Sequence, residues 1–211
     1  MSEKIVSVIT GDIVDSQKIA PEDYEKMLTI LKTVLTKLVE QVDARFDMYR
    51  GDAFQIVFFE PADAVLSALK IRLALKTSEL RIDARQCIGI GRAMHIGNDI
   101  KTSTGEAFVL SGTGLDKLKS NHLTIQSNNS AFQDKTYLLT KFLDAHISGL
   151  TTIQTEALWS YFDLTTKTHE DIATALGKKR TNITKLLNAS HYQLIEEYIR
   201  HFEKCVKEEY Q

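Results

Sequence analysis

The chain has 211 residues, of which 43% are hydrophobic and 26% charged, and its formal net charge is −2. This is the composition of a globular protein with one large domain or two smaller ones. The net charge excludes a protein that attracts nucleic acid through an overall positive charge. There is no apolar run of about 18 residues and no signal-peptide layout, so we expect a cytoplasmic protein without a membrane partner. Cys87 and Cys205 lie far apart without metal-like spacing, which predicts free thiols.

The first half of the chain alternates between strand and helix patterns. Apolar periodicity predicts, in chain order, a strand, a helix, a pair of strands, a second helix and a further strand, over residues 4–14, 21–42, 45–59, 61–77 and 85–96. A tight turn at Gly51-Asp52 joins the pair of strands, because a Gly-Asp pair between two apolar runs is typical of a hairpin. Gly89 and Gly91 lie on one side of the last strand, so we expect another segment to pack closely there.

A polar segment follows, and then a predicted helix over 107–120 and a strand over 122–127. The order strand, helix, hairpin, helix, strand predicts an α+β fold with a ferredoxin-like βαββαβ unit. In such a unit an antiparallel sheet carries its helices on one face.

From about residue 130 the pattern is helical throughout. The predicted helices cover 131–146, 152–163, 169–176, 180–189 and 191–209. We therefore divide the chain into an α+β domain, a connecting helix and an all-α domain, over 1–128, 129–150 and 151–211. The last helix carries an apolar stripe that fits either the core or the seam of a homodimer: Tyr192, Leu194, Ile195, Tyr198, Ile199, Phe202 and Val206.

Two aspartates stand at the ends of predicted strands. Asp12 closes the first strand within the stretch ITGDIVDS, and Asp52 lies in the hairpin turn. Because the first strand of a βαββαβ sheet lies beside the hairpin, we expect the two carboxylates to lie close together. Like charges repel, so such a pair calls for a cation, and Mg²⁺ accepts carboxylate and phosphate oxygens. Alternatively, Asp12, Asp15 and Ser16 serve only as a turn and helix cap.

The stretches TGDIVDS and YRGDAFQIVF, separated by a helix, resemble the class III nucleotidyl cyclase homology domain. The resemblance covers roughly residues 5–115 and implies a site for Mg²⁺ or Mn²⁺. Its ligands would be Asp12, the backbone carbonyl of Ile13, and Asp52.

The same resemblance places the triphosphate of a nucleotide near Ser16 and Lys18. Arg50 and Arg92 are candidate bidentate donors to phosphate. Each of these four side chains also fits an ordinary solvated residue.

The sequence departs from the cyclase pattern at three positions. Met48 stands in place of the lysine that selects the substrate. Val109 and Thr113 stand in place of the asparagine and arginine on the later helix. Without that arginine, the charge that develops on phosphate in the transition state loses its main support. The sequence therefore favours metal or nucleotide binding over cyclase activity.

A second resemblance covers the whole chain. The motifs ITGDIVDS, RGDAFQ, IGIG and GEAF, followed by LSG and LD, are similar in their order to the SatD family of bacterial proteins. This resemblance implies a cyclase-like N-terminal domain joined to a helical C-terminal region, and it implies no particular reaction.

The stretch THEDIATALGKKRTNITKLL, residues 168–187, resembles a helix-turn-helix. Thr168 and Asp171 form a capping box, Ala173 permits a close helix contact, and Gly177 ends the first helix. Lys178 departs from the aliphatic residue that is usual after the glycine. The exposed residues of the turn and the second helix suit contacts with double-stranded DNA: Lys178, Lys179, Arg180, Thr181, Thr184, Lys185 and Asn188. The alternative is a packing or dimerisation module.

These observations leave three functions open. The leading hypothesis is a regulator in which a phosphate or nucleotide ligand at Asp12 and Asp52 changes domain or dimer geometry and the helix-turn-helix binds DNA. The second is a nucleotide-processing enzyme related to nucleotidyl cyclases, with the helical domain as an accessory. The third is a protein-interaction scaffold without catalysis.

Overall fold

The computed structural model describes residues 4–49, 51–97, 99–164 and 168–210. Its strands and helices, in chain order, are β1 (Lys4–Ile13), α1 (Pro21–Val39), β2 (Ala44–Tyr49), β3 (Ala53–Phe58), α2 (Asp63–Thr77), β4 (Ala84–His95), β5 (Thr104–Gly105), α3 (Glu106–Lys117), β6 (Leu123–Ser127), α4 (Ser130–Gly149), α5 (Thr152–Asp163), α6 (His169–Ala175), α7 (Arg180–Ala189) and α8 (Tyr192–Tyr210). Each strand and helix that the sequence predicts has a counterpart here. Within these residues, no helix is both long and apolar enough to cross a membrane.

The sheet has six strands in the order β2-β3-β1-β4-β5, with β6 also paired to β4. β1 is central and runs antiparallel to β3 and to β4, which agrees with the predicted α+β class. The sheet is not antiparallel throughout, as the sequence predicted, because β6 runs parallel to β4. The chain between β4 and β6 includes β5 and α3, and a connection of this length can carry it back across the sheet so that β6 runs in the same direction as β4.

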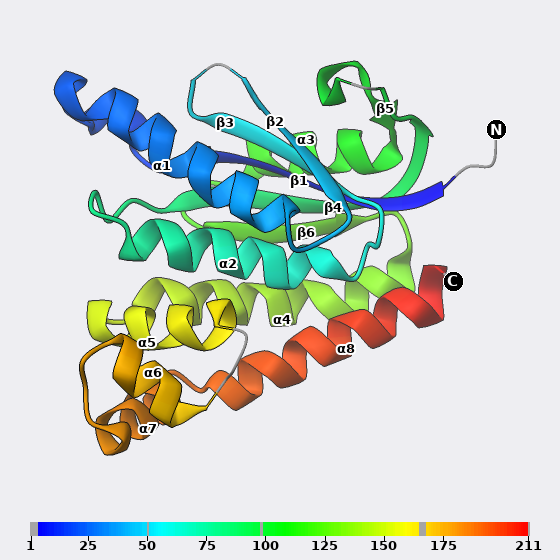
Figure 1. Ribbon diagram of the computed structural model, residues 1–211. Coiled ribbons are helices and arrows are strands. Elements are labelled where there is room, and N and C mark those ends of the chain that lie inside the picture. Colours follow the sequence, from blue (N-terminus) through cyan, green and yellow to red (C-terminus); the bar gives the residue numbers. More distant parts are fainter. Residues whose placement is uncertain (1–3, 50, 98, 165–167, 211) are drawn as a thin grey trace.

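Helices cover both faces of the sheet (Figure 1). Ile9 of β1 belongs to the core beneath α1 and α2, whereas its neighbour Val8 belongs to a second core beneath α3. The prediction that helices lie on one face only is therefore wrong. The cause lies in Gly89 and Gly91 of β4, because a Cβ at Gly89 would clash with the backbone carbonyl oxygen of Ala107 in α3. The close packing that these glycines predicted is confirmed.

The C-terminal helices form a layer that packs against α2 and the edge of the sheet (Figure 1). α4 contacts β6, α5 contacts α2, and α8 lies against α4. A single hydrophobic core runs from Ile9 in β1 to Val206 in α8. The α+β region and the helical region therefore share buried apolar surface.

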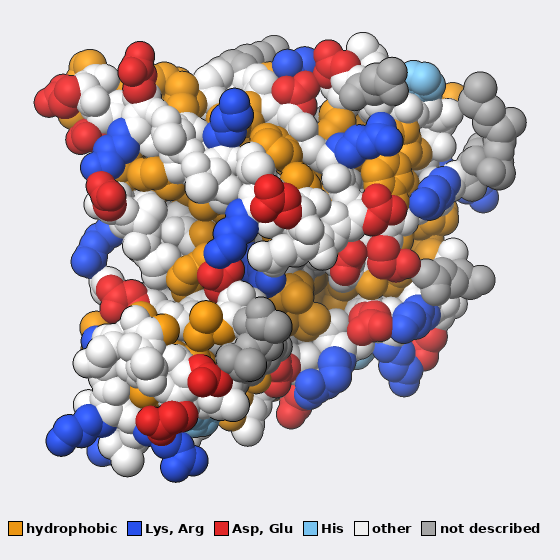
Figure 2. Space-filling view, viewed as in Figure 1, with side chains coloured by type: hydrophobic (Ala, Val, Ile, Leu, Met, Phe, Trp, Pro, Cys, Tyr) orange, Lys and Arg blue, Asp and Glu red, His pale blue; other side chains and the backbone are white. Residues whose placement is uncertain are grey.

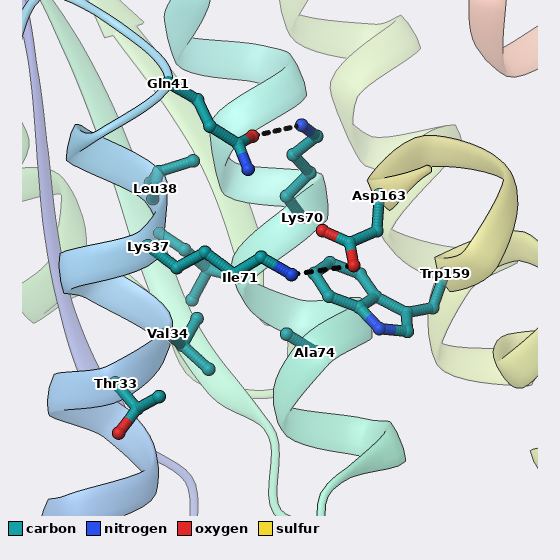
Figure 3. A pocket seen from close by; sticks show the side chains of 10 residues that line it. All are labelled: Thr33, Val34, Lys37, Leu38, Gln41, Lys70, Ile71, Ala74, Trp159 and Asp163. Carbon is teal, nitrogen blue, oxygen red and sulfur yellow. Dashed lines mark hydrogen bonds and ion pairs between the residues drawn. The ribbon is translucent and has the colours of Figure 1, made fainter. Parts of the chain in front are cut away.

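A cleft between α1, α2 and α5 shows how the two regions meet at the surface (Figure 3). Lys37 of α1 donates a hydrogen bond to the carboxylate of Asp163 at 2.8 Å and lies 5.6 Å from the centroid of the Trp159 ring. Lys70 of α2 donates to the Oε1 of Gln41 at 2.8 Å. Exposed ion pairs contribute at most about 1 kcal/mol, so the apolar contact between the helices provides most of the stabilisation that holds the regions together.

The helices at the end of the chain follow the predicted bounds closely. The Thr168 hydroxyl accepts a hydrogen bond from the Asp171 backbone N–H at 3.1 Å at the start of α6. Gly177, with φ of +60°, turns the chain between α6 and α7. The stripe on α8 divides into two parts: Leu194 is 63% exposed, whereas four of its residues are buried in the core of the chain, namely Ile195, Tyr198, Phe202 and Val206.

We predict that Gly89→Ala destabilises the protein. The added methyl group meets the backbone of α3, which cannot retreat without losing its contact with the sheet, so the free energy of unfolding should fall by about 1–3 kcal/mol. Gly112→Ala is the matched control, because a Cβ there meets nothing within 4 Å and alanine favours a helix over glycine. Urea denaturation of both variants measures the difference, and equal stability of the two would contradict the packing of α3.

Candidate functional site

An ion pair between Asp12 and Arg85 lies at the C-terminal end of β1. The two residues stand directly opposite each other on β1 and β4. Arg85 donates from Nε to Oδ1 of Asp12 at 2.8 Å and from Nη2 to Oδ2 at 2.6 Å. Bidentate charge-assisted pairs of this kind are strong and fix the orientation of both groups. The carboxylate at the end of the central strand is therefore paired with an arginine.

Arg85 is the centre of a group of acidic side chains. The hydrogen bonds with Asp12 raise the pKa of Arg85, partial burial opposes this, and the charges of Asp12, Asp52 and Asp116 add to it. Asp12 and Asp52 thus both act on one guanidinium. The Arg85 side chain keeps 35% of its surface exposed, so a solute can reach it.

A polar cavity of about 470 Å³ opens beside this pair. It is lined by the end of β1 and the loop after it, the hairpin turn, the start of β4 and the segment before β6: Asp12, Ile13, Val14, Asp15, Ser16, Gln17, Asp52, Arg85, Lys119, Ser120 and His122. Pockets for small molecules are commonly about 300–1,000 Å³. The cavity brings together Asp12, Ile13 and Asp52, the residues that the cyclase resemblance implies as metal ligands.

The arrangement of these residues does not fit a divalent cation at Asp12. Both carboxylate oxygens of Asp12 accept hydrogen bonds from Arg85, and a metal ion would have to displace the guanidinium. In the part of the chain that the structure describes, no three histidine, cysteine or acidic side chains are placed to hold a metal ion. Two carboxylates and a carbonyl are ligands that Mg²⁺ accepts, but here Arg85 supplies the positive charge.

The residues predicted to bind phosphate lie in different places. Ser16 lines the cavity. Lys18 lies on the same loop with its side chain 77% exposed and is not among the lining residues. Arg92 lies toward the C-terminal end of β4, whereas Arg85 lies at its start. Arg50 falls outside the described residues.

The two α3 positions that depart from the cyclase pattern lie away from the cavity lining. Val109 is 62% exposed. The Thr113 hydroxyl donates to the Val109 carbonyl at 2.8 Å, one turn earlier in the same helix. Neither side chain lines the cavity beside Asp12.

The residues predicted to contact DNA lie around α7, at one end of the molecule, where Figure 2 shows Lys and Arg side chains projecting into solvent. Five of them are exposed: Lys179, Arg180, Thr181, Lys185 and Asn188. Lys178 and Thr184 are half-buried. The Thr184 hydroxyl lies 2.9 Å from Nδ1 of His169 and donates to the Arg180 carbonyl at 3.1 Å. Its polar group is therefore directed toward α6 and its own helix.

A buried arginine lies behind the cavity. Arg72 of α2 is 1% exposed. It donates from Nε and Nη2 to Asp83 at 2.9 and 2.7 Å, from Nη1 to Asp144 at 2.7 Å, and from Nη2 to the Ser148 hydroxyl at 2.9 Å. The backbone N–H of His122 donates to Asp144 at 3.0 Å, and its Nδ1 lies 3.1 Å from Asp83. One guanidinium thus joins α2, α4 and the segments that precede β4 and β6.

Arg72 and Asp83 are both held in their charged forms. Burial alone would lower the pKa of Arg72, but the hydrogen bonds and charges of Asp83 and Asp144 outweigh it and raise that pKa. Burial alone would raise the pKa of Asp83, but hydrogen bonds from Arg72 and His122 and the charge of Arg72 hold it well below its ordinary value. Because Asp83 precedes Arg85 by two residues and His122 lines the cavity, this network also positions two parts of the cavity wall.

The cations of this region are not evident from the sequence. Arg85 stands there only as the first residue of a predicted strand, because its partner Asp12 lies far away in the sequence and the pairing depends on strand register. A signal for the buried network was available in Arg72, which stands between Ile71 and Leu73 in the stretch IRLAL. A charge at such a position needs buried partners.

No protein-family model matches this sequence, and no curated protein matches it significantly. Among solved structures, the guanylyl cyclase Cya2 is 16% identical, with 59% of this chain and 75% of that chain covered and a TM-score of 0.45. A bacterial light-regulated adenylyl cyclase is 16% identical over 59% of this chain and 77% of that chain, with a TM-score of 0.48. The catalytic core of a rhodopsin-guanylyl cyclase with converted specificity, in complex with ATPαS, is 22% identical over 58% of this chain and 77% of that chain, with a TM-score of 0.49.

The similarity to these cyclases is too distant to assign an activity. Because the identities are low and the TM-scores lie below 0.5, the activities of those cyclases do not transfer to this chain. The resemblance to the SatD family and the helix-turn-helix both stay predictions.

We predict that Asp83→Asn reduces the acid sensitivity of the fold. The folded-state pKa of Asp83 is lowered, so its stabilising effect is complete above the unfolded-state value of about 4 and is lost as the pH falls below it. Between pH 6 and pH 3 the variant should lose about 1 kcal/mol less stability than the wild type.

Urea denaturation at several pH values measures this slope, with the exposed Asp134→Asn as the control for removing one carboxylate. At neutral pH, Asp83→Asn should itself be less stable, since it weakens a buried ion pair. An acid-side slope equal to that of the wild type would contradict the assignment.

Proposed function

We propose that the chain binds a phosphorylated small molecule of nucleotide size in the cavity beside Asp12. The observation that carries this proposal is the Asp12–Arg85 pair, which lines a polar cavity of about 470 Å³. In this proposal, residues 1–128 form a ferredoxin-like domain related to nucleotidyl cyclases, and residues 151–211 form a helix-turn-helix domain.

The recognition of phosphate rests on Arg85 and Lys119. The guanidinium of Arg85 presents two parallel N–H donors, which here meet the two oxygens of a carboxylate at 2.8 and 2.6 Å. Two phosphate oxygens match the same donor geometry, so a ligand phosphate can take the place of Asp12. Lys119 lines the same cavity and adds a second positive charge. Asp12 then keeps Arg85 oriented in the absence of ligand.

Neutral polar groups complete the cavity. Ser16, Gln17 and Ser120 line it and offer hydrogen bonds to hydroxyl groups or to a base. The order of the motifs TGDIVDS and YRGDAFQIVF supports a nucleotide as the ligand class, because it resembles that of the nucleotidyl cyclases.

The residues support binding of a nucleotide without its cyclisation. Val109 and Thr113 occupy the positions at which the cyclase pattern has asparagine and arginine, and neither lines the cavity. No cation from α3 is therefore available there among the lining residues to stabilise charge on a transferring phosphate.

We expect a nucleoside triphosphate to raise the melting temperature of the wild type by about 5–10 °C at a concentration near 100 times its dissociation constant. Arg85→Met should abolish this shift because it removes the bidentate phosphate donor. Arg92→Met is the matched control, since Arg92 lies on the same strand away from the cavity.

A thermal-shift panel of adenine and guanine nucleotides, run with and without Mg²⁺, measures the effect. The readout is the ligand-induced shift within each variant, so a change in basal stability does not enter. The absence of any shift across the panel, or equal shifts in both arginine variants, would overturn the proposed site.

A second function, DNA binding by α7, is supported by the charge around its N-terminus. Residues 178–185 include Lys178, Lys179, Arg180 and Lys185 and no acidic residue. The side chains of Lys179, Arg180 and Lys185 are exposed. Together with the ligand site, this supports the interpretation of the chain as a ligand-responsive regulator.

For DNA binding, we predict that Lys179→Ala combined with Arg180→Ala weakens the affinity for a random duplex at least tenfold at low salt, because two phosphate contacts are lost. Arg200→Ala with Lys204→Ala removes the same charge from exposed positions of α8 and is the control. Fluorescence anisotropy with labelled duplex measures both. If the wild type does not bind duplex at about 50 mM salt, or both double variants lose affinity equally, α7 is not the binding element.

A further inference from the structure

A second polar pocket, lined by three lysines, adjoins the cavity beside Asp12. It has a volume of about 390 Å³ and opens between the C-terminal end of α3, the segment before β6, β6 itself and α4. Its lysines are Lys117, Lys119 and Lys141, and none of the described residues that line it is acidic. The formal net charge of the whole chain is −2, so three lysines around one hollow without a counter-charge indicate an anionic ligand.

The charges of these lysines are not neutralised by the protein. Within the described ranges, neither Lys117 nor Lys119 forms an ion pair. The Lys141 ammonium lies 5.5 Å from the centroid of the Tyr137 ring, which also lines the pocket, and this contact holds the ammonium without cancelling its charge. Asp116 precedes Lys117 in α3, but it does not line the pocket and its charge acts on Arg85.

A buried hydroxyl group forms part of the wall of the pocket. Thr124 of β6 lines the pocket and is only 7% exposed, and its hydroxyl makes no hydrogen bond to any residue that the structure describes. The oxygen is not enclosed by protein, in contrast to the unpartnered oxygens of Ser7 and Gln86. Because buried hydroxyl groups normally have a partner, the oxygen of a ligand fits here. Gln126, two residues further along the strand, adds an amide to the same wall.

We propose that this pocket, which we call the basic pocket, binds a chain of phosphate groups. Lys117 comes from α3 and Lys141 from α4, so a chain of several phosphates can contact both ammonium groups at once. Lysine binds phosphate as a point charge, while the Thr124 hydroxyl and the Gln126 amide can donate hydrogen bonds to its oxygens. The volume of the pocket lies in the range of small-molecule sites.

The phosphate chain can come from two sources. It can be free inorganic polyphosphate, or it can be the triphosphate of a nucleotide whose remainder lies in the cavity beside Asp12. The second source is possible because the two pockets share Lys119 and Ser120 as lining residues. The basic pocket itself does not depend on the proposed nucleotide site, since Lys117, Thr124 and Lys141 line only the basic pocket.

The first test measures the binding of inorganic tripolyphosphate to the full chain by isothermal titration calorimetry at about 50 mM salt. Lys117→Gln combined with Lys141→Gln should raise the dissociation constant at least about tenfold, because two charge-assisted contacts are lost. Lys32→Gln with Lys204→Gln removes the same charge from exposed positions of α1 and α8 and is the matched control. No binding by the wild type at about 1 mM tripolyphosphate, or an equal loss in both double variants, would overturn the proposal.

Thr124→Val tests the pocket without changing its charge. Valine keeps the shape of the side chain and the preference for a strand but removes the hydroxyl. The variant should bind tripolyphosphate about threefold more weakly or worse, because one hydrogen bond to a charged group is lost. An affinity equal to that of the wild type would show that the phosphate chain does not lie in this pocket.

Adenosine triphosphate distinguishes the two sources. If a nucleotide supplies the chain, it should bind at least about tenfold more tightly than tripolyphosphate, and Arg85→Met should remove this difference. If free polyphosphate is the ligand, the two probes should bind equally well and Arg85→Met should change neither. Both results support the basic pocket. A failure of the nucleotide site at Arg85 thus affects only the nucleotide measurement, whereas a failure of the basic pocket is seen with tripolyphosphate.

Discussion

The burial of Arg72 between Asp83 and Asp144 is the constraint on which the rest of the molecule depends. Its guanidinium joins helix α2 to α4 and to the segments that lead into β4 and β6. Taking three charges out of water is costly unless each charge finds its partners. Here the hydrogen bonds are complete enough to keep Arg72 and Asp83 charged, as the opposite shifts in their pKa values indicate.

This network also bears on the candidate site. Asp83 anchors the start of β4 through its bond to Arg72, and its backbone carbonyl accepts a hydrogen bond from the N–H of Val14 at 2.9 Å, just beyond β1. Arg85 follows two residues later and meets Asp12 across the strands. Asp83, the partner of the buried Arg72, thus lies two residues before the half-buried Arg85, so the geometry of the cavity follows from the packing of α2 and α4.

The helices and strands could be predicted well from the sequence, but the face of the sheet that each helix covers could not. The hairpin, α2 and the helices from α4 to α8 follow from apolar periodicity and from turn residues such as Gly51 and Gly177, which act within a few positions of the chain. Gly89 and Gly91 indicated a close approach, yet not that α3 would make it from the opposite face. That outcome depends on how α3 crosses the sheet, which no local pattern encodes.

The same division holds for the site. The sequence by itself determined that a carboxylate would stand at the end of the first strand and another in the hairpin, because strand ends and turns can be recognised from short stretches. Only the tertiary structure decided what faces Asp12. Antiparallel pairing of β1 with β4 brings Arg85 opposite it, so the predicted cation is a guanidinium from the chain itself. The register between two strands depends on many weak contacts between segments that are far apart in the sequence. The partner of a charged residue can therefore be identified only in the folded chain.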